Sequence, residues 1–165
     1  MSAVMARATT PWTFFNFSEL HISVAKTFSL RHNEIDIFCE QLGEAVRAAK
    51  LGEIFVSFDK WKLLVNDTKT TSFVSLVSSK NNSQVLDAIE AVDNIMRRFD
   101  HPTYYNPPII HASIAWSPCD MMSILGVQEK ALSEGIITPE VTCEAGISTL
   151  ECKVGKVVYS WSLVD

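Results

Sequence analysis

Two short segments of this 165-residue chain repeat one pattern of a histidine and a serine. In "LHISVA" (20–25) and "IHASIA" (110–115), an apolar residue is followed by His, any residue, Ser, an apolar residue and Ala. Side chains two residues apart on a β-strand point to the same face. The histidine of each segment would therefore lie beside its serine, which makes His21 and His111 the first candidates for chemistry.

Two imidazoles and two hydroxyls around one cleft suit the chemistry of phosphodiesters. A neutral histidine can accept a proton from a nucleophile while a protonated one donates a proton to the leaving oxygen, because free histidine titrates at about pH 6.5. The hydroxyls of Ser23 and Ser113 can donate hydrogen bonds to non-bridging phosphate oxygens. We predict that His21 and His111 form an acid–base pair that needs no metal. The alternative at this point is two independent histidines of the core.

The other two histidines fit such a site less well. His101 lies in "HPT" (101–103), which meets a loose form of the pattern but belongs to a proline-rich loop rather than to an apolar strand. His32 stands where a helix is expected to begin, a usual place for a surface or capping residue. We expect neither residue to take part in catalysis.

The elements that must position the two motifs follow from the spacing of apolar residues. Alternation of apolar and polar residues predicts a strand over 19–28, and helical spacing predicts a helix over 32–51. The segment 53–65 is rich in strand-forming residues. A turn signal at 66–70 then separates it from a returning strand at 71–78.

The second half of the chain continues this mixture of helices and strands. Several strand pairs are joined by short turns, which favours an α+β fold with antiparallel sheets over a doubly wound parallel sheet. The length fits one domain over 1–165, in which two lobes contribute one motif each. The expected elements are a helix over 83–99, a loop with three prolines over 100–108, the strand of the second motif over 109–116, a shorter helix over 121–135 and a final hairpin over 148–163.

Composition and charge limit the kinds of partner. The net charge of −5 argues against a protein that coats nucleic acid through a basic surface, so any nucleic-acid site should be small and local. No apolar run reaches the about 18 residues needed to cross a membrane. The four cysteines form no C-x-x-C motif and no zinc-ligand spacing with histidine. We expect a reduced, intracellular protein without metal or cofactor, whose cysteines are small buried hydrophobic residues.

The two motifs resemble the paired H-x-S/T-x-Φ motifs of the two-histidine (2H) phosphoesterase superfamily. Within that superfamily, the chain is most similar to the U6 small nuclear RNA phosphodiesterase family. The third of the four matching segments is the most specific, because a tyrosine, prolines and H-x-S-x-A-W occur together in it. The four segments cover most of residues 19–163 and are "LHISVAKTFSLRHNEI", "LLVNDTKTTSF", "AVDNIMRRFDHPTYYNPPIIHASIAW" and "CKVGKVVYSWSL".

This resemblance implies a bilobal α+β fold, with two antiparallel sheets flanked by helices around a central groove. It implies a nuclear 3′–5′ exoribonuclease that trims the uridine-rich end of U6 snRNA, a component of the splicing machinery. A 2′-hydroxyl would attack the adjacent phosphate and leave a 2′,3′-cyclic phosphate, which some members open to a 3′-phosphate. The implied partner is the RNA 3′ end with its oligouridine tail, with no metal, cofactor or membrane, and we expect a monomer.

The resemblance also assigns roles to individual residues. By matching position, His21 and His111 become the acid–base pair, and Ser23 and Ser113 become the phosphate binders. The family places an aromatic residue six positions before the second histidine, where it stacks on the terminal base, and here that residue is Tyr105. Such stacking contributes about 1–3 kcal/mol and tolerates several bases. The alternative is a loop tyrosine that packs on its own prolines.

The chain departs from the family pattern in two places. After "KT" in the second segment the family pattern has an arginine, whereas this chain has Thr71. Family members usually carry an extra strand, and often a basic region, before the first motif, where this chain has only residues 1–18. The interpretations left open are a trimmed first lobe, a short isoform and a truncated gene model.

Two other functions stay open at this stage. The same four motif residues would serve another 2H activity, such as opening a 2′,3′-cyclic phosphodiester or cutting a 2′–5′ linkage. The chain could also be a non-catalytic module that binds RNA 3′ ends. The two intact H-x-S pairs argue against this last function, because binding alone needs no matched acid and base.

Overall fold

The computed structural model describes residues 14–80, 82–125 and 142–164 of the chain. Helices and strands are mixed along these residues, and all paired strands are antiparallel, so the predicted α+β class is confirmed. The elements in chain order are β1 (Phe15–Asn16), a 3₁₀ turn η1 (His32–Glu34), α1 (Ile35–Ala49), β2 (Ile54–Phe58), β3 (Lys60–Val65), β4 (Ser72–Val77), α2 (Ser83–Arg98), β5 (His111–Ser117), α3 (Met121–Leu125), β6 (Cys143–Ile147), β7 (Thr149–Val154) and β8 (Val157–Ser162).

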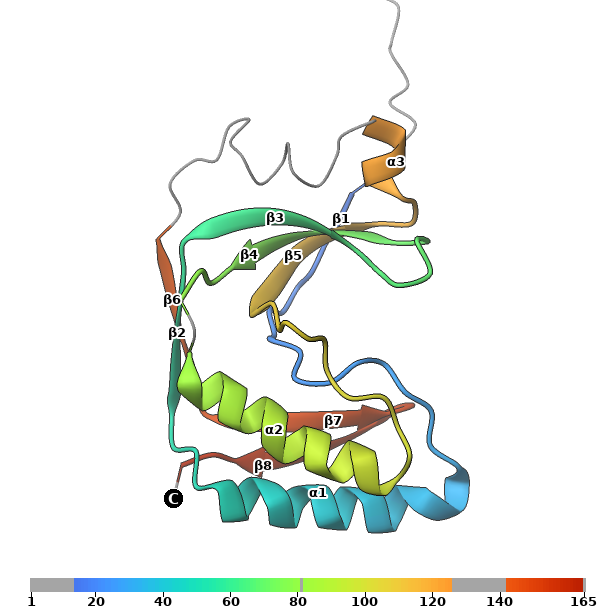
Figure 1. Cartoon of the computed structure of the whole chain (residues 1–165), viewed down its shortest axis with the longest axis vertical. Coiled ribbons are helices and arrows are strands. Elements are labelled where there is room, and N and C mark those ends of the chain that lie inside the picture. The colour runs from blue at the N-terminus through green and yellow to red at the C-terminus, as the bar shows by residue number, and fades with distance from the viewer. Residues whose placement is uncertain (1–13, 81, 126–141, 165) are drawn as a thin grey trace, which may run out of the picture.

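The described strands form one four-stranded sheet and two two-stranded sheets, where the sequence predicted two sheets. The large sheet has the order β1-β5-β4-β3, and the small ones pair β2 with β6 and β7 with β8. In Figure 1 the large sheet forms the upper part of the molecule, α1, α2 and the β7–β8 sheet form the lower part, and β2 with β6 stands at one side. That these parts form one domain, in which two lobes contribute one motif each, stays a prediction.

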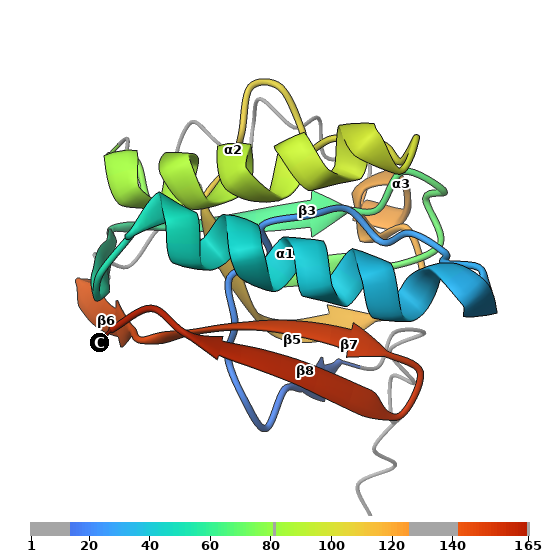
Figure 2. The same cartoon turned by 90° about the horizontal axis from the view of Figure 1, so that it is seen from below.

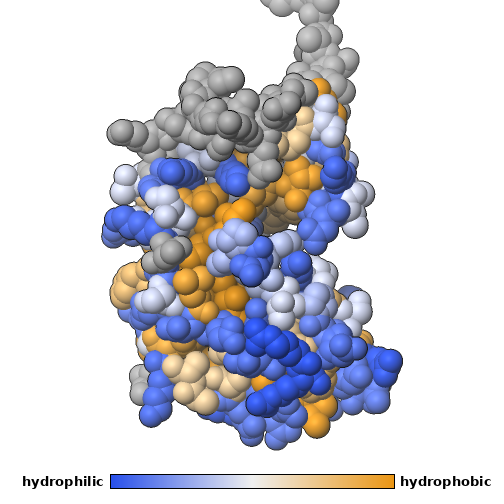
Figure 3. Space-filling model, viewed as in Figure 1, coloured by the Kyte–Doolittle hydropathy of each residue, from blue (hydrophilic) through white to orange (hydrophobic). Residues whose placement is uncertain are grey.

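The two long helices, α1 and α2, lie in the lower part of the molecule (Figure 1). α1 lies between α2 and the β7–β8 sheet (Figure 2) and contacts both. Their buried side chains recur at helical spacing, as the sequence predicts, and include Phe38 and Leu42 in α1 and Val92 and Met96 in α2. The Asn82 side chain accepts a hydrogen bond from the backbone of Val85 and so caps the start of α2. The outer surface of α2 is hydrophilic (Figure 3).

Two hydrophobic clusters form the core. The first joins β2, β4 and β5 to the N-terminal half of α2, and the second joins α1 to β7 and the C-terminal half of α2. Val24 and Leu163 pack against both clusters, so residues from both ends of the described chain link them. Gly43 lets α1 approach β8 closely, because a Cβ atom there would collide with the indole of Trp161.

The predicted strand over 19–28 is wrong as a regular element. Among its residues only Ile22 forms a β-bridge, to Ala112, and the rest of the segment is irregular. Several apolar residues of the segment nevertheless pack on the core, with Ile22 on the first cluster and Phe28 on the second, whereas Leu20 is exposed. The alternation therefore gave the side that faces the core, except at Leu20. A strand also needs a continuous neighbour for its backbone hydrogen bonds, and the segment has one at a single position.

Other element predictions are confirmed in part. The segment 53–65 divides at Asp59 into β2 and β3, which belong to different sheets. The short strands β1 and β6 were not predicted, because two residues carry no alternation and "CEAGI" has few strand-forming residues. The helix expected over 121–135 is described only as α3, and its remainder lies outside the described residues. The closing hairpin is confirmed as β7 and β8.

The cysteines are only partly the buried residues that the sequence predicted. Cys39 and Cys152 are buried, whereas Cys119 is half-buried and Cys143 is exposed. The expectation was therefore wrong for Cys143, which lies in β6 of a two-stranded sheet. Burial raises the pKa of the Cys152 thiol to about 11. No helix of the described residues is long and apolar enough to cross a membrane.

Candidate functional site

The two histidine–serine motifs meet at one antiparallel bridge. Ile22 of the first motif pairs with Ala112 of the second, although the two residues are far apart in the sequence. Ala112 is buried, and Ile22 packs against the same hydrophobic cluster. The residues between His and Ser in both motifs therefore face the core, and packing fixes how the two segments align.

This alignment sets the motif residues opposite one another in reversed order. In an antiparallel pairing the residue before a bridge on one chain lies across from the residue after it on the other. His21 therefore lies on the side of Ser113, and Ser23 on the side of His111. Since side chains alternate between faces along β5, His111 and Ser113 are on the face opposite to Ala112. The repeated pattern in the sequence thus corresponds to a local pseudo-twofold arrangement.

His111 is held by a hydrogen bond to the backbone. Its Nδ1 lies 2.7 Å from the carbonyl oxygen of Ile109. A carbonyl oxygen only accepts hydrogen bonds, so Nδ1 must carry the proton and donate it. Nε2 is then the ring nitrogen that can exchange a proton with a ligand. The half-buried ring begins β5 and therefore has a fixed direction.

His21 is held more loosely. It is exposed and follows an irregular stretch, and its ring forms a T-shaped pair with Phe17 at 6.3 Å between ring centroids. The bridge at the next residue, Ile22, fixes its backbone at one point. The two histidines thus differ in how firmly they are placed, a difference that the two similar motifs do not indicate.

Ser113 has a buried hydroxyl neighbour that the sequence analysis missed. Its Oγ lies 3.0 Å from Oγ of Ser75, which is opposite Ser113 in the pairing of β4 with β5. Ser75 is fully buried and Ser113 is half-buried. The only signal in the sequence was a polar residue inside the apolar strand "SFVSLV", and its partner could not be known without the register.

Lysines share this face of the large sheet. Lys62 of β3 is opposite Ser75, and Lys60 is opposite Val77, which is in turn opposite His111. Residues directly opposite each other in a sheet point to the same face. Across the sheet, Ser113 is therefore in line with Lys62, and His111 is in line with Lys60. This face carries positive charges although the whole chain has a net charge of −5.

Tyr105 lies on the loop before β5 with an exposed fraction of 41%. The ammonium group of Lys26 lies 4.2 Å from its ring centroid, a cation–π contact with the segment that carries the first motif. Burial, together with the charge and hydrogen bonding of the nearby Asp67 carboxylate, raises the pKa of the Tyr105 hydroxyl. Three segments therefore meet at this ring, which does not simply pack on its own prolines.

The position where an arginine was expected lies in the turn between β3 and β4. The backbone of Thr71 donates to the Asn66 side chain, and its carbonyl accepts from the Asn66 backbone. Asn66 also accepts from the backbone of Thr70. The predicted turn over 66–70 is thus confirmed, and Thr71 closes it through its backbone.

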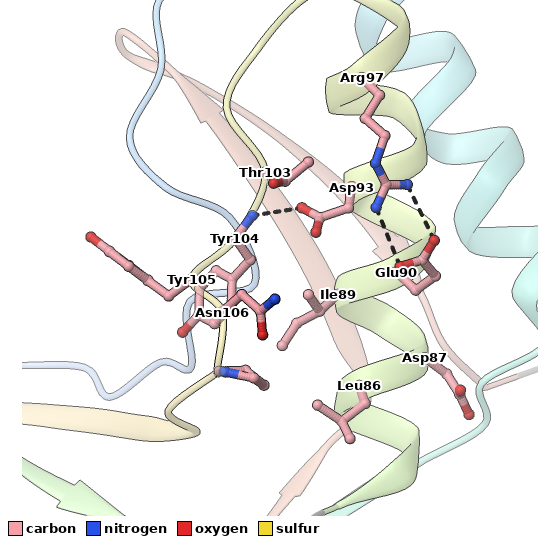
Figure 4. A pocket seen from close by; sticks show the side chains of 11 residues that line it. Leu86, Asp87, Ile89, Glu90, Asp93, Arg97, Thr103, Tyr104, Tyr105 and Asn106 are labelled. Atoms are coloured by element: carbon pink, nitrogen blue, oxygen red, sulfur yellow. Dashed lines mark hydrogen bonds and ion pairs between the residues drawn. The ribbon is translucent and has the colours of Figure 1, made fainter.

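A separate hollow of about 450 Å³ lies behind the Tyr105 loop, against α2 (Figure 4). Three carboxylates line it, from Asp87, Glu90 and Asp93, against one guanidinium, from Arg97. Arg97 is engaged by Glu90 at 3.2 Å, and Asp93 accepts a hydrogen bond from the backbone of Tyr104. Tyr105 also lines the hollow, but the two histidines and two serines of the motifs do not, and its acidic lining does not suit a phosphate. The described residues contain no group of three or more His, Cys, Asp or Glu that could hold a metal ion.

Comparison with known proteins places the chain among RNA phosphodiesterase relatives. It is 30% identical over 149 residues to a Rattus norvegicus protein named U6 snRNA phosphodiesterase 1, an alignment that covers 88% of this chain and 55% of the relative. A Mus musculus protein of the same name is 35% identical over 98 residues, which are 59% of this chain and 36% of that one. The chain thus spans about half the length of the curated relatives it matches.

A solved structure and a family model also match this chain. The structure of Kluyveromyces marxianus Usb1 with uridine monophosphate matches with a TM-score of 0.59 and 13% identity, over 92% of this chain and 81% of that one. At this identity the likeness concerns the fold alone. The HVSL family model, described as an uncharacterised conserved protein, matches residues 5–162. The chain therefore belongs to the HVSL family and is a relative of the proteins named U6 snRNA phosphodiesterase 1.

Proposed function

We propose that the chain is a metal-independent 3′–5′ exoribonuclease that trims uridine-rich RNA 3′ ends. The observation that carries this proposal is the antiparallel bridge between Ile22 and Ala112, which aligns two His-x-Ser motifs in opposite directions. A pseudo-twofold pair of imidazoles and hydroxyls suits a reaction in which one proton leaves a nucleophile and another joins a leaving group. The names of the relatives support RNA as the substrate.

The proposed reaction is an internal transfer of the phosphoryl group. The 2′-oxygen of the penultimate ribose attacks the phosphorus atom that links it to the terminal nucleoside. One histidine of the pair His21 and His111 accepts the 2′-hydroxyl proton. The bond from phosphorus to the 5′-oxygen of the terminal nucleoside breaks, and the other histidine protonates that oxygen. The products are a free terminal nucleoside and an RNA that ends in a 2′,3′-cyclic phosphate.

The remaining site residues would bind the substrate. Ser23 and Ser113 would donate hydrogen bonds to the non-bridging oxygens, whose negative charge grows in the transition state. Tyr105 would stack on the terminal base, and its Lys26 neighbour brings a positive charge that suits a polyanion. By family, the natural substrate would be the oligouridine tail of U6 snRNA in the nucleus, and the protein would act as a monomer without a cofactor.

The test removes one 2′-hydroxyl at a time from an oligouridine substrate, in buffer that contains EDTA. A 2′-deoxy group at the penultimate ribose should abolish trimming, because it removes the nucleophile. The same substitution at the terminal ribose should leave trimming in place, because that hydroxyl has no phosphate on its 3′ side to attack. The length of the RNA and the mass of its new end are measured.

Other results would indicate a different function. Trimming of the penultimate deoxy substrate would mean that water is the nucleophile. Opening of a small 2′,3′-cyclic phosphodiester without trimming of long RNA would indicate another 2H activity. Tight binding of the RNA end with no product at all would indicate a binding module, in which the irregular first segment does not bring His21 to the phosphate.

Ser75 gives a further prediction for this reaction. Ser113 has one hydroxyl proton, so it can donate that proton to a phosphate and still hydrogen-bond to Ser75 only if Ser75 is the donor. A Ser75→Ala substitution should therefore lower kcat roughly three- to tenfold, which corresponds to one hydrogen bond of about 0.5–1.5 kcal/mol. The substitution should have no further effect when Ser113 is already alanine, because the two residues act together.

Ser117 provides the matched control for Ser75. It is also a fully buried serine of the large sheet, but it points to the other face of that sheet. Its partner Ser72 is three positions before Ser75 along β4, and side chains an odd number of positions apart on a strand are on opposite faces. Ser117→Ala should leave kcat unchanged, whatever it does to stability. An equal loss of kcat from both substitutions, or an additive loss in the Ser75 and Ser113 double variant, would mean that Ser75 acts only through general stability.

A further inference from the structure

A row of apolar side chains crosses the large sheet next to the motif residues. Trp116 of β5 is opposite Phe73 of β4 on one side and Phe15 of β1 on the other. Residues directly opposite each other share a face of the sheet, so these three rings, called here the aromatic row, point the same way. Leu64 of β3 is opposite Phe73 and extends the row to the far strand.

A β-bulge brings the aromatic row onto the face that carries Ser113. On β4, Phe73 and Ser75 are two residues apart and therefore share a face. Their partners on β5, Trp116 and Ser113, are three residues apart, because the register shifts between Val74 and Ser75. Without this shift, Trp116 would point to the opposite face. The aromatic row thus lies about 7 Å along the strands from the row of Ser75 and Ser113.

The aromatic row is accessible at its outer end. Phe15 has an exposed fraction of 45%, and its ring stacks on Trp116 at 4.8 Å between centroids with 28° between the planes. Trp116 and Phe73 are half-buried. The opposite face of the same strands supplies the core through Leu76 and Ala112. The aromatic row therefore adds an open aromatic surface that this core does not use.

The neighbourhood of the aromatic row is complementary to one kind of ligand. Single-stranded nucleic acid is bound by aromatic rings that stack on bases, placed beside cationic and hydrogen-bonding groups that hold the phosphates. Here the adjacent row contains the half-buried hydroxyl of Ser113 and the positive charge of Lys62. An apolar protein partner would gain nothing from these polar groups, so the charge pattern favours a nucleic acid.

We propose that the aromatic row is a stacking platform for bases on the 5′ side of the cleaved phosphate. This inference rests on the proposed exoribonuclease function and adds a second base site to the one at Tyr105. Tyr105 stacks on the base of the leaving nucleoside, and the aromatic row stacks on a base of the RNA that remains. The enzyme thereby holds single-stranded RNA on both sides of the reacting phosphate and selects ends that are not base-paired.

The test compares two ligands with the variant Phe15→Ala. One ligand is an oligouridine made resistant to cleavage by a 2′-deoxy group at its penultimate ribose, and the other is uridine 5′-monophosphate, which represents only the leaving side. Loss of a stacked ring should raise Kd for the oligouridine about 5- to 150-fold. Kd for uridine monophosphate should not change. Trp116→Phe, which keeps an aromatic ring, should have the smaller effect on oligouridine binding.

Two controls separate stacking from other causes. Phe55→Ala removes a phenylalanine that is 62% exposed and lies in the β2–β6 sheet, and it should change neither Kd. An RNA whose residues on the 5′ side lack bases should bind the wild type and Phe15→Ala equally. The proposal is overturned if Phe15→Ala binds oligouridine as tightly as Phe55→Ala does. It is also overturned if Phe15→Ala raises Kd for the base-free RNA as much as it raises Kd for oligouridine. Wild-type trimming in the same preparations reports on the exoribonuclease function independently.

Discussion

Replacing His111 or His21 by alanine is expected to lower the rate of RNA trimming by about 10²–10⁴-fold for either residue. Each substitution removes one of the two groups that move protons in the proposed reaction. The double variant should be scarcely slower than the slower single variant, because a reaction that needs both groups is already lost when one is missing. Single-turnover trimming of an oligouridine by each variant measures this effect.

His32 provides the control for this experiment. It is an exposed histidine in the short turn η1 before α1 and belongs to neither H-x-S motif. His32→Ala should keep the wild-type rate. Full activity of both His21→Ala and His111→Ala would end the catalytic interpretation of the motifs. A large loss in His111→Ala with normal activity in His21→Ala would mean that the loosely held first segment supplies no proton-transfer group.

The second large effect is expected on stability, from Phe38→Ala in α1. Phe38 has an exposed fraction of 0% and its ring lies within 5.2 Å of Phe28 and 5.1 Å of Phe99, between centroids. Removing a phenylalanine from such a site costs about 3–5 kcal/mol of the free energy of unfolding, through lost burial and the cavity that remains. Most domains are stable by only about 5–15 kcal/mol, so much of the stability should disappear.

Chemical denaturation of Phe38→Ala and of Ile37→Ala measures this difference. Ile37 is the preceding residue of the same helix but is 48% exposed, so its replacement should cost little. Phe28 ends the predicted segment 19–28 that carries His21, and it packs on Phe38. Phe38→Ala should therefore also lower trimming at temperatures where it is still folded. Equal stability losses in both variants would contradict the placement of Phe38 in the core.

The helices and the closing hairpin could be predicted because their signals are local. The apolar stripes of α1 and α2 recur every three or four residues, and β7 and β8 are joined by a two-residue turn with Gly155 at φ +61°. The strand over 19–28 could not be predicted correctly in this way. Its alternation indicates which side chains contact the core, except at Leu20, but pairing depends on what lies beside the segment, and only Ile22 among its residues has a strand partner.

The residues of the candidate site were predictable to different degrees. His21, Ser23, His111 and Ser113 stood out because they repeat one pattern at two places in the chain. Ser75 did not stand out, because a lone serine in a strand has many explanations until its partner is known. Nor could the contacts of Tyr105 be foreseen, since Lys26 and Asp67 come from separate segments.

By itself the sequence determined the chemical groups of this protein and the buried side of most of its elements. Both are properties of residue type and of spacing over a few positions. The tertiary structure alone decided which residues lie opposite one another. Ser75 is opposite Ser113, and the shift beside Val74 turns Trp116 to the same face. A change of register by one residue moves a side chain to the other face, and register is set by hydrogen bonds and packing between segments far apart in the chain.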